Sequence, residues 1–115
     1  MTLRGSVLWA DLGTPLGSEQ GGRRPVVVVS REAINRTSPV VIVVPLTTFR
    51  GQRLFPSDVL VRSGEAGLPD DSVAVGLQVR VLSKLRLGRP LGSLPEGTIA
   101  ALEEALVQVL DLPGA

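Results

Sequence analysis

The chain has 115 residues, contains neither cysteine nor histidine, and carries a formal net charge of +1. A chain of this length predicts a single domain, residues 1–115, that buries about two thirds of its unfolded surface. Without thiol or imidazole groups, disulfide staples, cysteine or histidine catalysis and the common structural zinc sites are excluded. We therefore expect neither a metal nor a cofactor.

Charge is divided unevenly along the chain. Residues 1–94 hold all 12 basic side chains and 7 acidic ones, whereas residues 95–115 hold 4 acidic side chains alone. Eleven of the 12 cations are arginine, whose planar guanidinium suits bidentate contact with phosphate, so an anionic ligand is one interpretation. The other interpretation is that the excess of arginine reflects the codon bias of a GC-rich genome. Because the apolar runs are too short for a bilayer and no signal peptide opens the chain, we expect a cytoplasmic protein without a membrane segment.

Short apolar segments bounded by Gly, Pro, Asn or Ser predict a series of strands. They lie at residues 6–12, 26–29, 40–46, 57–62, 72–75 and 77–81, with a bulge at Gly76 between the last two. Residues 13–25 form a long hairpin connection, and brief helical turns are predicted at 31–35 and 83–87. The strands at 26–29 and 40–46 are interpreted as fully buried, because β-branched residues dominate them.

The last part of the chain predicts an amphipathic helix. Ser93-Leu94-Pro95-Glu96 has the spacing of a capping box. Apolar residues then recur at helical intervals, at Ile99, Leu102, Leu106 and Leu110. Short strands followed by one terminal helix predict a mainly β domain, an antiparallel and partly closed barrel.

The glycine-rich connection carries the most distinctive motif. The run Gly17-Ser18-Glu19-Gln20-Gly21-Gly22-Arg23-Arg24-Pro25, followed by four valines, resembles the signature of the MazF/PemK family of toxin endoribonucleases. Further similar segments are Arg4–Trp9, Asn35–Pro39, Val43–Thr48 and, more weakly, Asp71–Val73 and Gln78–Arg80. The resemblance covers nearly the whole chain and implies an SH3-like barrel.

Arg24 is the first candidate catalytic residue. It precedes a proline, which restricts its backbone, so its guanidinium should be held in a nearly fixed place. There it could neutralise the charge that develops on a reacting phosphate, or pair with Glu19 or Asp11 to pin the loop. The residues alone leave both roles open, and the resemblance favours catalysis, because the arginine before this proline is catalytic in the family. Arg23 is interpreted as an exposed, solvated cation.

Thr47 and Glu19 are the other candidate catalytic residues. Thr47 ends a buried strand, where its hydroxyl could donate to a phosphate oxygen or cap the strand. The family places its catalytic threonine or serine at this position, and Thr48 is a nearby substitute. Glu19 could act as a base or hold Arg24 by a salt bridge, and we favour the salt bridge. Ser18 and Gln20 are expected to organise the loop through backbone hydrogen bonds.

Candidate RNA contacts follow from the same resemblance. Recognition of single-stranded RNA uses flat side chains on which bases stack, and Phe49 and Phe55 flank a polar loop that carries Arg50 and Arg53. Phe55 is expected to be partly buried by its neighbours. Trp9 is interpreted as a core residue. The full set of predicted RNA-binding residues is Ser18, Gln20, Thr48, Phe49, Arg50, Arg53, Phe55, Gln78 and Arg80.

The resemblance implies a homodimeric, metal-independent toxin that cuts single-stranded RNA, chiefly messenger RNA, at a short sequence. The 2′-hydroxyl would attack the adjacent phosphate, leaving a 2′,3′-cyclic phosphate and a free 5′-hydroxyl. The partner it implies is a cognate antitoxin with an acidic, disordered tail. Two alternatives stay open: a non-enzymatic toxin that resembles CcdB and binds DNA gyrase, and an inactive barrel that binds only RNA or protein.

Two residues depart from the family pattern. Ser6 stands where an acid is common, and we expect an effect on local packing only. Leu77 precedes Gln78 where many members carry Asp or Glu, a group implicated in the reaction or in base contacts. An apolar residue there predicts slower cleavage or a changed sequence preference.

Overall fold

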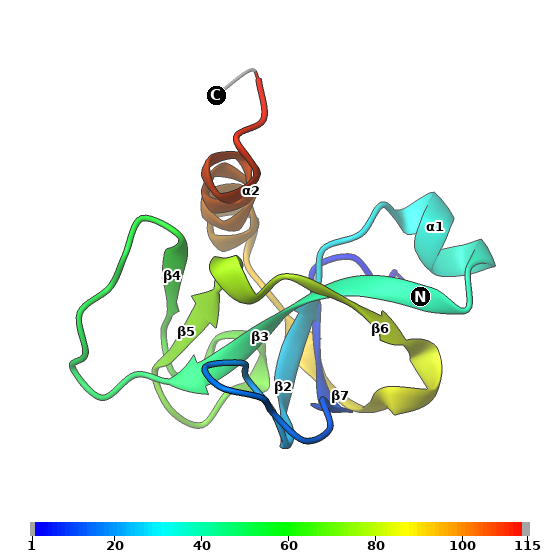
Figure 1. Cartoon of the computed structure of the whole chain (residues 1–115), viewed down its shortest axis with the longest axis horizontal. Coiled ribbons are helices and arrows are strands. Elements are labelled where there is room, and N and C mark those ends of the chain that lie inside the picture. Colours follow the sequence, from blue (N-terminus) through cyan, green and yellow to red (C-terminus); the bar gives the residue numbers. More distant parts are fainter. Residues whose placement is uncertain (1, 114–115) are drawn as a thin grey trace.

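An antiparallel sheet of seven strands organises the fold, which a computed structural model describes for residues 2–113 (Figure 1). The strands are β1 Ser6–Asp11, β2 Arg23–Val28, β3 Val40–Thr48, β4 Asp58–Val61, β5 Ser72–Val75, β6 Arg80–Ser83 and β7 Leu87–Ser93. The helices are α1 Glu32–Thr37 and α2 Glu96–Leu110, and 3-10 turns lie at η1 Glu65–Gly67, η2 Gly76–Gln78 and η3 Lys84–Arg86. The main strand order is β4-β5-β3-β2-β1-β7, and β6 pairs with β3.

β3 is the central strand, because it pairs with β2, β5 and β6. Its first half, Val40–Val43, pairs with β6, and its last residues, Leu46–Thr48, pair with β5. The outer strands β4 and β7 do not pair with each other in the described part of the chain, so the sheet stays open. The predicted fold, a mainly β, partly closed antiparallel barrel with a C-terminal helix, is confirmed.

The core lies on both faces of β2. Val27 belongs to a buried cluster that includes Leu102 of α2, whereas Val26 and Val28 belong to a second cluster on the opposite face. All three valines are almost fully buried, whereas Val29 lies beyond the end of β2 and is half-buried. A run of β-branched residues is favoured where a strand is covered on two sides, so the prediction of full burial is confirmed for three of its four residues.

β3 is covered less completely than predicted. Val40 and Ile42 remain 39% and 40% exposed, while Val41 and Val43 are fully buried. The alternation shows that only one face of this half of the strand packs against the core. The prediction of a fully buried strand is wrong here, because Val40, Ile42 and the Val81 that pairs with Ile42 remain partly exposed to solvent.

Three predicted elements differ in position. β2 begins at Arg23, three residues before the predicted start at Val26, so Arg24 lies in the strand and not in the loop. The strand expected at residues 77–81 begins only at Arg80, because residues 76–78 form η2. β5 pairs with β3 at Ala74–Leu46, and β6 pairs with β3 at Arg80–Val43. The β5–β6 segment covers six residues between these two pairs while β3 covers three, so η2 accommodates the three extra residues.

The capping box predicted at the start of α2 is also wrong. Ser93 ends β7, and the helix N-cap is Pro95 without a side-chain cap.

β7 is the strand that the sequence did not predict. It contains Gly88, Pro90 and Gly92, residues that disfavour strands, yet it pairs with β1 through an irregular register. A side chain at Gly92 would place its Cβ 2.7 Å from the carbonyl carbon of Ala66. Glycine is therefore needed for the close approach of η1, and this tertiary contact overrides the weak strand propensity.

Candidate functional site

The β1–β2 loop folds back on itself. The Leu12 amide donates to the Gly22 carbonyl at 2.9 Å, and the Gly22 amide donates to the Gly13 carbonyl at 2.7 Å. Gly21 packs so closely on Pro15 that a Cβ would lie 2.4 Å from the proline Cδ. The predicted hairpin connection is therefore a compact loop, with glycine required by contact at Gly21.

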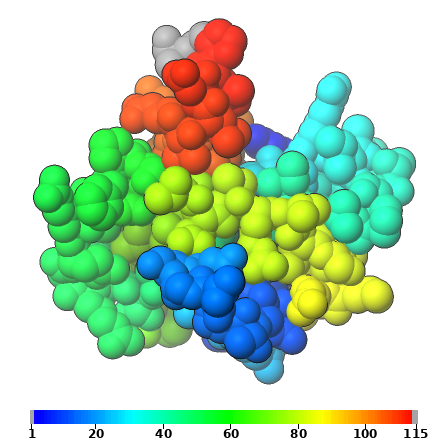
Figure 2. All heavy atoms as spheres, in the orientation of Figure 1, coloured from blue at the N-terminus to red at the C-terminus, as the bar shows by residue number. Residues whose placement is uncertain are grey.

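Gln78 fastens this loop to the segment between β5 and β6. Its Oε1 accepts from the Gln20 amide at 3.3 Å, and its Nε2 donates to the Ser18 carbonyl at 3.0 Å. Figure 2 shows the loop, in blue, lying against the yellow-green η2–β6 segment on one face of the molecule. The predicted loop-organising roles of Ser18 and Gln20 thus act through their main chains.

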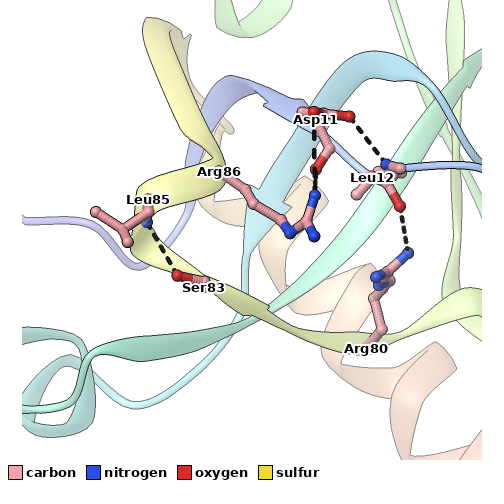
Figure 3. Close-up of polar contacts among 7 residues, drawn as sticks. Asp11, Leu12, Arg80, Ser83, Leu85 and Arg86 are labelled. Atoms are coloured by element: carbon pink, nitrogen blue, oxygen red, sulfur yellow. Dashed lines mark hydrogen bonds and ion pairs between the residues drawn. The ribbon is translucent and has the colours of Figure 1, made fainter.

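Two arginines hold the other side of the loop (Figure 3). Arg80 Nη1 donates to the Leu12 carbonyl at 3.3 Å, and Arg86 Nη1 donates to the Asp11 carbonyl at 3.4 Å. Arg86 also lies 4.0 Å from the Asp11 carboxylate. The guanidinium of Arg80, predicted to contact RNA, is therefore engaged with the loop, and any RNA contact by Gln78 or Arg80 stays a prediction.

Arg24, in β2, is oriented by main-chain carbonyls. Its Nε donates to Gly21 at 3.0 Å and its Nη1 to Leu46 at 3.5 Å. The remaining N–H groups of the guanidinium have no protein partner among the described residues. A charged donor that is held in place but not saturated can bind an oxyanion with little reorganisation.

The guanidinium borders a cavity of about 360 Å³ between β2, β3 and the η1–β5 connection. Thr47 and Thr48 line the same cavity, which confirms that Arg24 and the predicted threonines come together. Its remaining polar and aromatic lining residues are Trp9, Arg23, Arg50, Asp70 and Ser72. The cavity therefore combines arginine and hydroxyl donors, as a phosphate group requires.

Three lining residues correct or extend the sequence analysis. Trp9 is only half-buried, and the Arg23 guanidinium lies over its ring at 5.3 Å from the centroid. The prediction of Trp9 as a core residue is wrong, because it forms a wall of the cavity. Asp70 was not predicted as a site residue. The only feature of the sequence that could have identified it is its position in the Asp70-Asp71-Ser72 segment before β5.

Glu19 does not steady Arg24. Its carboxylate accepts from the Leu16 amide at 2.8 Å, within the loop, and no ion pair joins it to Arg24 in the described structure. The predicted salt bridge is wrong because the loop curls Glu19 back toward Leu16, away from β2. The Gly21 and Leu46 carbonyls take the orienting role instead.

The polar loop between β3 and β4 carries the other candidates. Phe49 is half-buried and its amide donates to the Asp71 carbonyl at 2.8 Å. Phe55 is 56% exposed and is therefore partly buried, as expected. The Arg53 guanidinium lies 5.3 Å from the centroid of its ring. Arg50 lines the Arg24 cavity, whereas Arg53 and Phe55 lie beyond Thr47.

Within residues 2–113, no group of three or more Asp and Glu side chains converges as a metal site. In the same range, no helix is both long and apolar enough to cross a membrane.

The fold and the site together define a small open-barrel protein with a pocket lined by arginine and threonine side chains. A model of the PemK-like, MazF-like toxins of type II toxin-antitoxin systems matches residues 3–110. The chain belongs to this family.

Known relatives agree with this assignment. The chain is 39% identical over 106 residues to the endoribonuclease MazF of Staphylococcus epidermidis, covering 92% of this chain and 88% of the relative. It superposes with a TM-score of 0.80 and 31% identity on a mycobacterial endoribonuclease solved in complex with its cognate antitoxin, with both chains fully covered. A Mycobacterium tuberculosis toxin, MazF-mt6, gives a TM-score of 0.79 and 28% identity over 95% of this chain and 99% of the toxin.

Proposed function

We propose that this toxin is a metal-independent endoribonuclease that cuts single-stranded RNA, chiefly messenger RNA, at a short sequence. The observation that carries the proposal is the Arg24 guanidinium, oriented by two carbonyls and bordering a cavity that Thr47 and Thr48 also line. The endoribonucleases among its relatives support the reaction class. Because the charge-stabilising group is an arginine, no step of this chemistry requires a bound metal.

The reaction is an internal transfer at phosphorus. The ribose 2′-oxygen loses its proton and bonds to the adjacent phosphorus, the bond from phosphorus to the 5′-oxygen breaks, and the departing oxygen takes up a proton from water. The products therefore carry a 2′,3′-cyclic phosphate and a 5′-hydroxyl. Arg24 donates to the phosphorane oxygens, whose charge grows in the transition state. The Thr47 hydroxyl donates to the same group and positions it. Glu19 supports the site indirectly, by shaping the loop that holds Gly21.

Asp70 is our candidate acceptor for the 2′-hydroxyl proton, since its carboxylate lies among the residues lining the Arg24 cavity. Proton transfer to a positioned side chain contributes roughly 100- to 10,000-fold. Asp70→Asn should therefore lower the cleavage rate at least about 100-fold. A rate close to that of the wild-type protein would exclude this role.

The proposed partners are a second copy of the chain and a cognate antitoxin. The basic body, with 12 cations before residue 95, suits an antitoxin whose acidic, disordered tail folds across the arginine-lined surface. One relative, a mycobacterial endoribonuclease, was solved in complex with its cognate antitoxin. A homodimer in the cytoplasm is the expected state, and sedimentation as a monomer at micromolar concentration would contradict it.

The test is cleavage of a long RNA in the presence of EDTA. We expect discrete products, a cyclic phosphate at the new 3′ end, and complete resistance of a substrate that carries 2′-deoxyribose at the cut position. Cleavage of that substrate at the same phosphate would indicate attack by water. A gyrase-binding toxin or an inactive barrel would leave the RNA intact.

A further inference from the structure

One wall of the Arg24 cavity is a loop, residues 62–71, which runs from the end of β4 through η1 to the start of β5. The last part of this loop lines the cavity with Leu68, Pro69 and Asp70. Within the loop, the Gly64 amide donates to the Leu68 carbonyl at 2.8 Å. The position of the 62–71 loop therefore sets how close Asp70 comes to a group bound at Arg24.

β7 holds the middle of the 62–71 loop from behind. A Cβ at Gly67 would collide with the Leu91 carbonyl oxygen, and a Cβ at Gly92 would lie 2.7 Å from the carbonyl carbon of Ala66. Because the two segments pack so closely, the middle of the loop cannot shift unless β7 moves with it. Movement of the loop is therefore possible mainly at its two ends.

Asp71 joins these two ends. Its Oδ1 accepts from the Ser63 amide at 2.8 Å, and its Oδ2 lies 4.0 Å from the Arg62 guanidinium. The Asp71 carbonyl accepts from the Phe49 amide at 2.8 Å, which attaches the same residue to the chain just after β3. One residue therefore closes the 62–71 loop and ties it to the strand that carries the cavity threonines.

The Asp71 side chain does this from outside the cavity. Asp70 and Ser72 line the cavity on either side of it, and successive side chains of an extended chain point to opposite faces. The Asp71 side chain is 39% exposed and contacts Ser63 and Arg62 instead. It can therefore set the geometry of the cavity without touching a bound substrate.

We propose that Asp71 is a positioning residue, which holds Asp70 in place against RNA bound at Arg24. This inference rests on the proposed function, in which Asp70 accepts the 2′-hydroxyl proton. The hydrogen bond from the Ser63 amide to the Asp71 carboxylate is charge-assisted, and such bonds are stronger than neutral ones. A misplacement of about 1 Å can lower a rate by about 100-fold, so a bond that closes the loop is sufficient to control the reaction.

Cleavage kinetics of three Asp71 variants test this role. Asp71→Ala removes the bond to Ser63, Asp71→Glu moves the carboxylate by one methylene, and Asp71→Asn keeps an oxygen that can accept from the same amide. We expect kcat to fall roughly 10- to 100-fold in Asp71→Ala and Asp71→Glu, with little change in KM. Asp71→Asn should cleave RNA at close to the wild-type rate.

Glu103→Ala is the control for the loss of one negative charge. Glu103 pairs with Arg4 at 2.9 Å and lies on α2, whereas the Arg24 cavity is lined by strands and loops. Its kinetics should match those of the wild-type protein. Urea titration of every variant allows rates to be compared per folded molecule. A purely structural role of Asp71 would change stability but would produce neither the fall in kcat at constant KM nor the rescue by asparagine.

A double variant shows whether Asp71 acts through Asp70. If it does, Asp71→Ala should slow an Asp70→Asn protein much less than it slows the wild-type protein. Losses that multiply would overturn the proposal. So would wild-type kcat in folded Asp71→Glu, or an Asp71→Asn protein as slow as Asp71→Ala. Failure of the proposed function is a separate result, because the wild-type protein would then cut no RNA, and failure of the Asp70 assignment would appear in Asp70→Asn alone.

Discussion

Glu32 in α1 and Arg24 in β2 show two ways in which this fold holds a charged side chain. The Glu32 carboxylate accepts from Asn35 Nδ2 and the Arg4 amide, both at 2.9 Å, and from the Leu3 amide at 3.0 Å. Arg24 donates only to two carbonyls, one of them at 3.5 Å, and borders an open cavity. The first group is saturated by the protein, and the second is not.

We infer that the difference separates a structural charge, at Glu32, from a charge that is available to a ligand, at Arg24. Hydrogen bonds from Asn35 and from the Arg4 and Leu3 amides lower the pKa of Glu32 from 4.5 to about 2, so the carboxylate ties the N-terminal segment to α1 in its ionised form. Arg24 keeps donor capacity for a ligand. Substitutions at Glu32 or at its hydrogen-bond partner Asn35 should therefore alter stability, and substitutions around Arg24 should alter catalysis.

The largest effect is expected at Arg24. Arg24→Ala should lower RNA cleavage at least about 100- to 1,000-fold, since removing one transition-state donor commonly costs this much. Arg24→Lys should be nearly as damaging, because an ammonium group cannot reproduce the planar fork. Single-turnover kinetics and circular dichroism check the two claims together. Near-normal turnover by Arg24→Lys would show that a point charge is sufficient and that Arg24 does not act as proposed.

A substitution at Asn35 should have the opposite pattern of effects, on stability rather than on catalysis. It is 1% exposed, donates to the Ser30 carbonyl at 2.9 Å, and accepts from the Ser30 hydroxyl. Asn35→Ala should reduce the free energy of unfolding by about 1–3 kcal/mol, because buried partners lose their hydrogen bonds. Thr37→Ala, exposed on the same helix, is the matched control and should change stability little. Urea titration measures both, and cleavage per folded Asn35→Ala molecule should be unchanged.

Gln78 lies between these two cases, since it is a structural contact at the functional site. Gln78→Ala removes both hydrogen bonds to the β1–β2 loop, which carries the Gly21 carbonyl that orients Arg24. We expect a fall in cleavage rate of roughly tenfold, since a net hydrogen bond is worth about 0.5–1.5 kcal/mol, and a smaller loss of stability than in Asn35→Ala, because Gln78 is only half-buried. Gln108→Ala, exposed on α2, is the control. A loss of stability as large as that of Asn35→Ala would reassign Gln78 to the structural class.

The smallest effect concerns the pH dependence of stability. Because Glu32 binds its proton less tightly when folded than unfolded, its contribution is complete above about pH 4.5 and is lost as pH falls toward about 2. The carboxylate is partly exposed, so solvent screening keeps the effect modest. Unfolding free energies measured between these pH values should fall less steeply in Glu32→Gln than in the wild-type protein. Parallel curves would show that Glu32 is not the titrating group.

Much of the fold follows from local pattern. The valine runs, the long loop and α2 were predicted from patterns among neighbouring residues, although β2 begins three residues earlier than predicted. β7 could not be predicted, since Gly88, Pro90 and Gly92 disfavour a strand and only pairing with β1 stabilises it. The displaced start of β6 has the same origin, because the three-residue insertion at η2 is visible only against β3.

The sequence by itself determined which groups could carry the chemistry. Because the chain has no cysteine or histidine, the candidate catalytic groups were arginine, hydroxyl and carboxylate side chains. The motif around Arg24 then identified one arginine among them. Tertiary structure decided which of these groups meet. It turned Glu19 toward Leu16, brought Trp9 and Asp70 to the Arg24 cavity, and left Leu77 exposed beside Phe55. The physical reason is that these contacts join segments distant in the chain, whose positions depend on strand register and loop closure rather than on neighbouring residues.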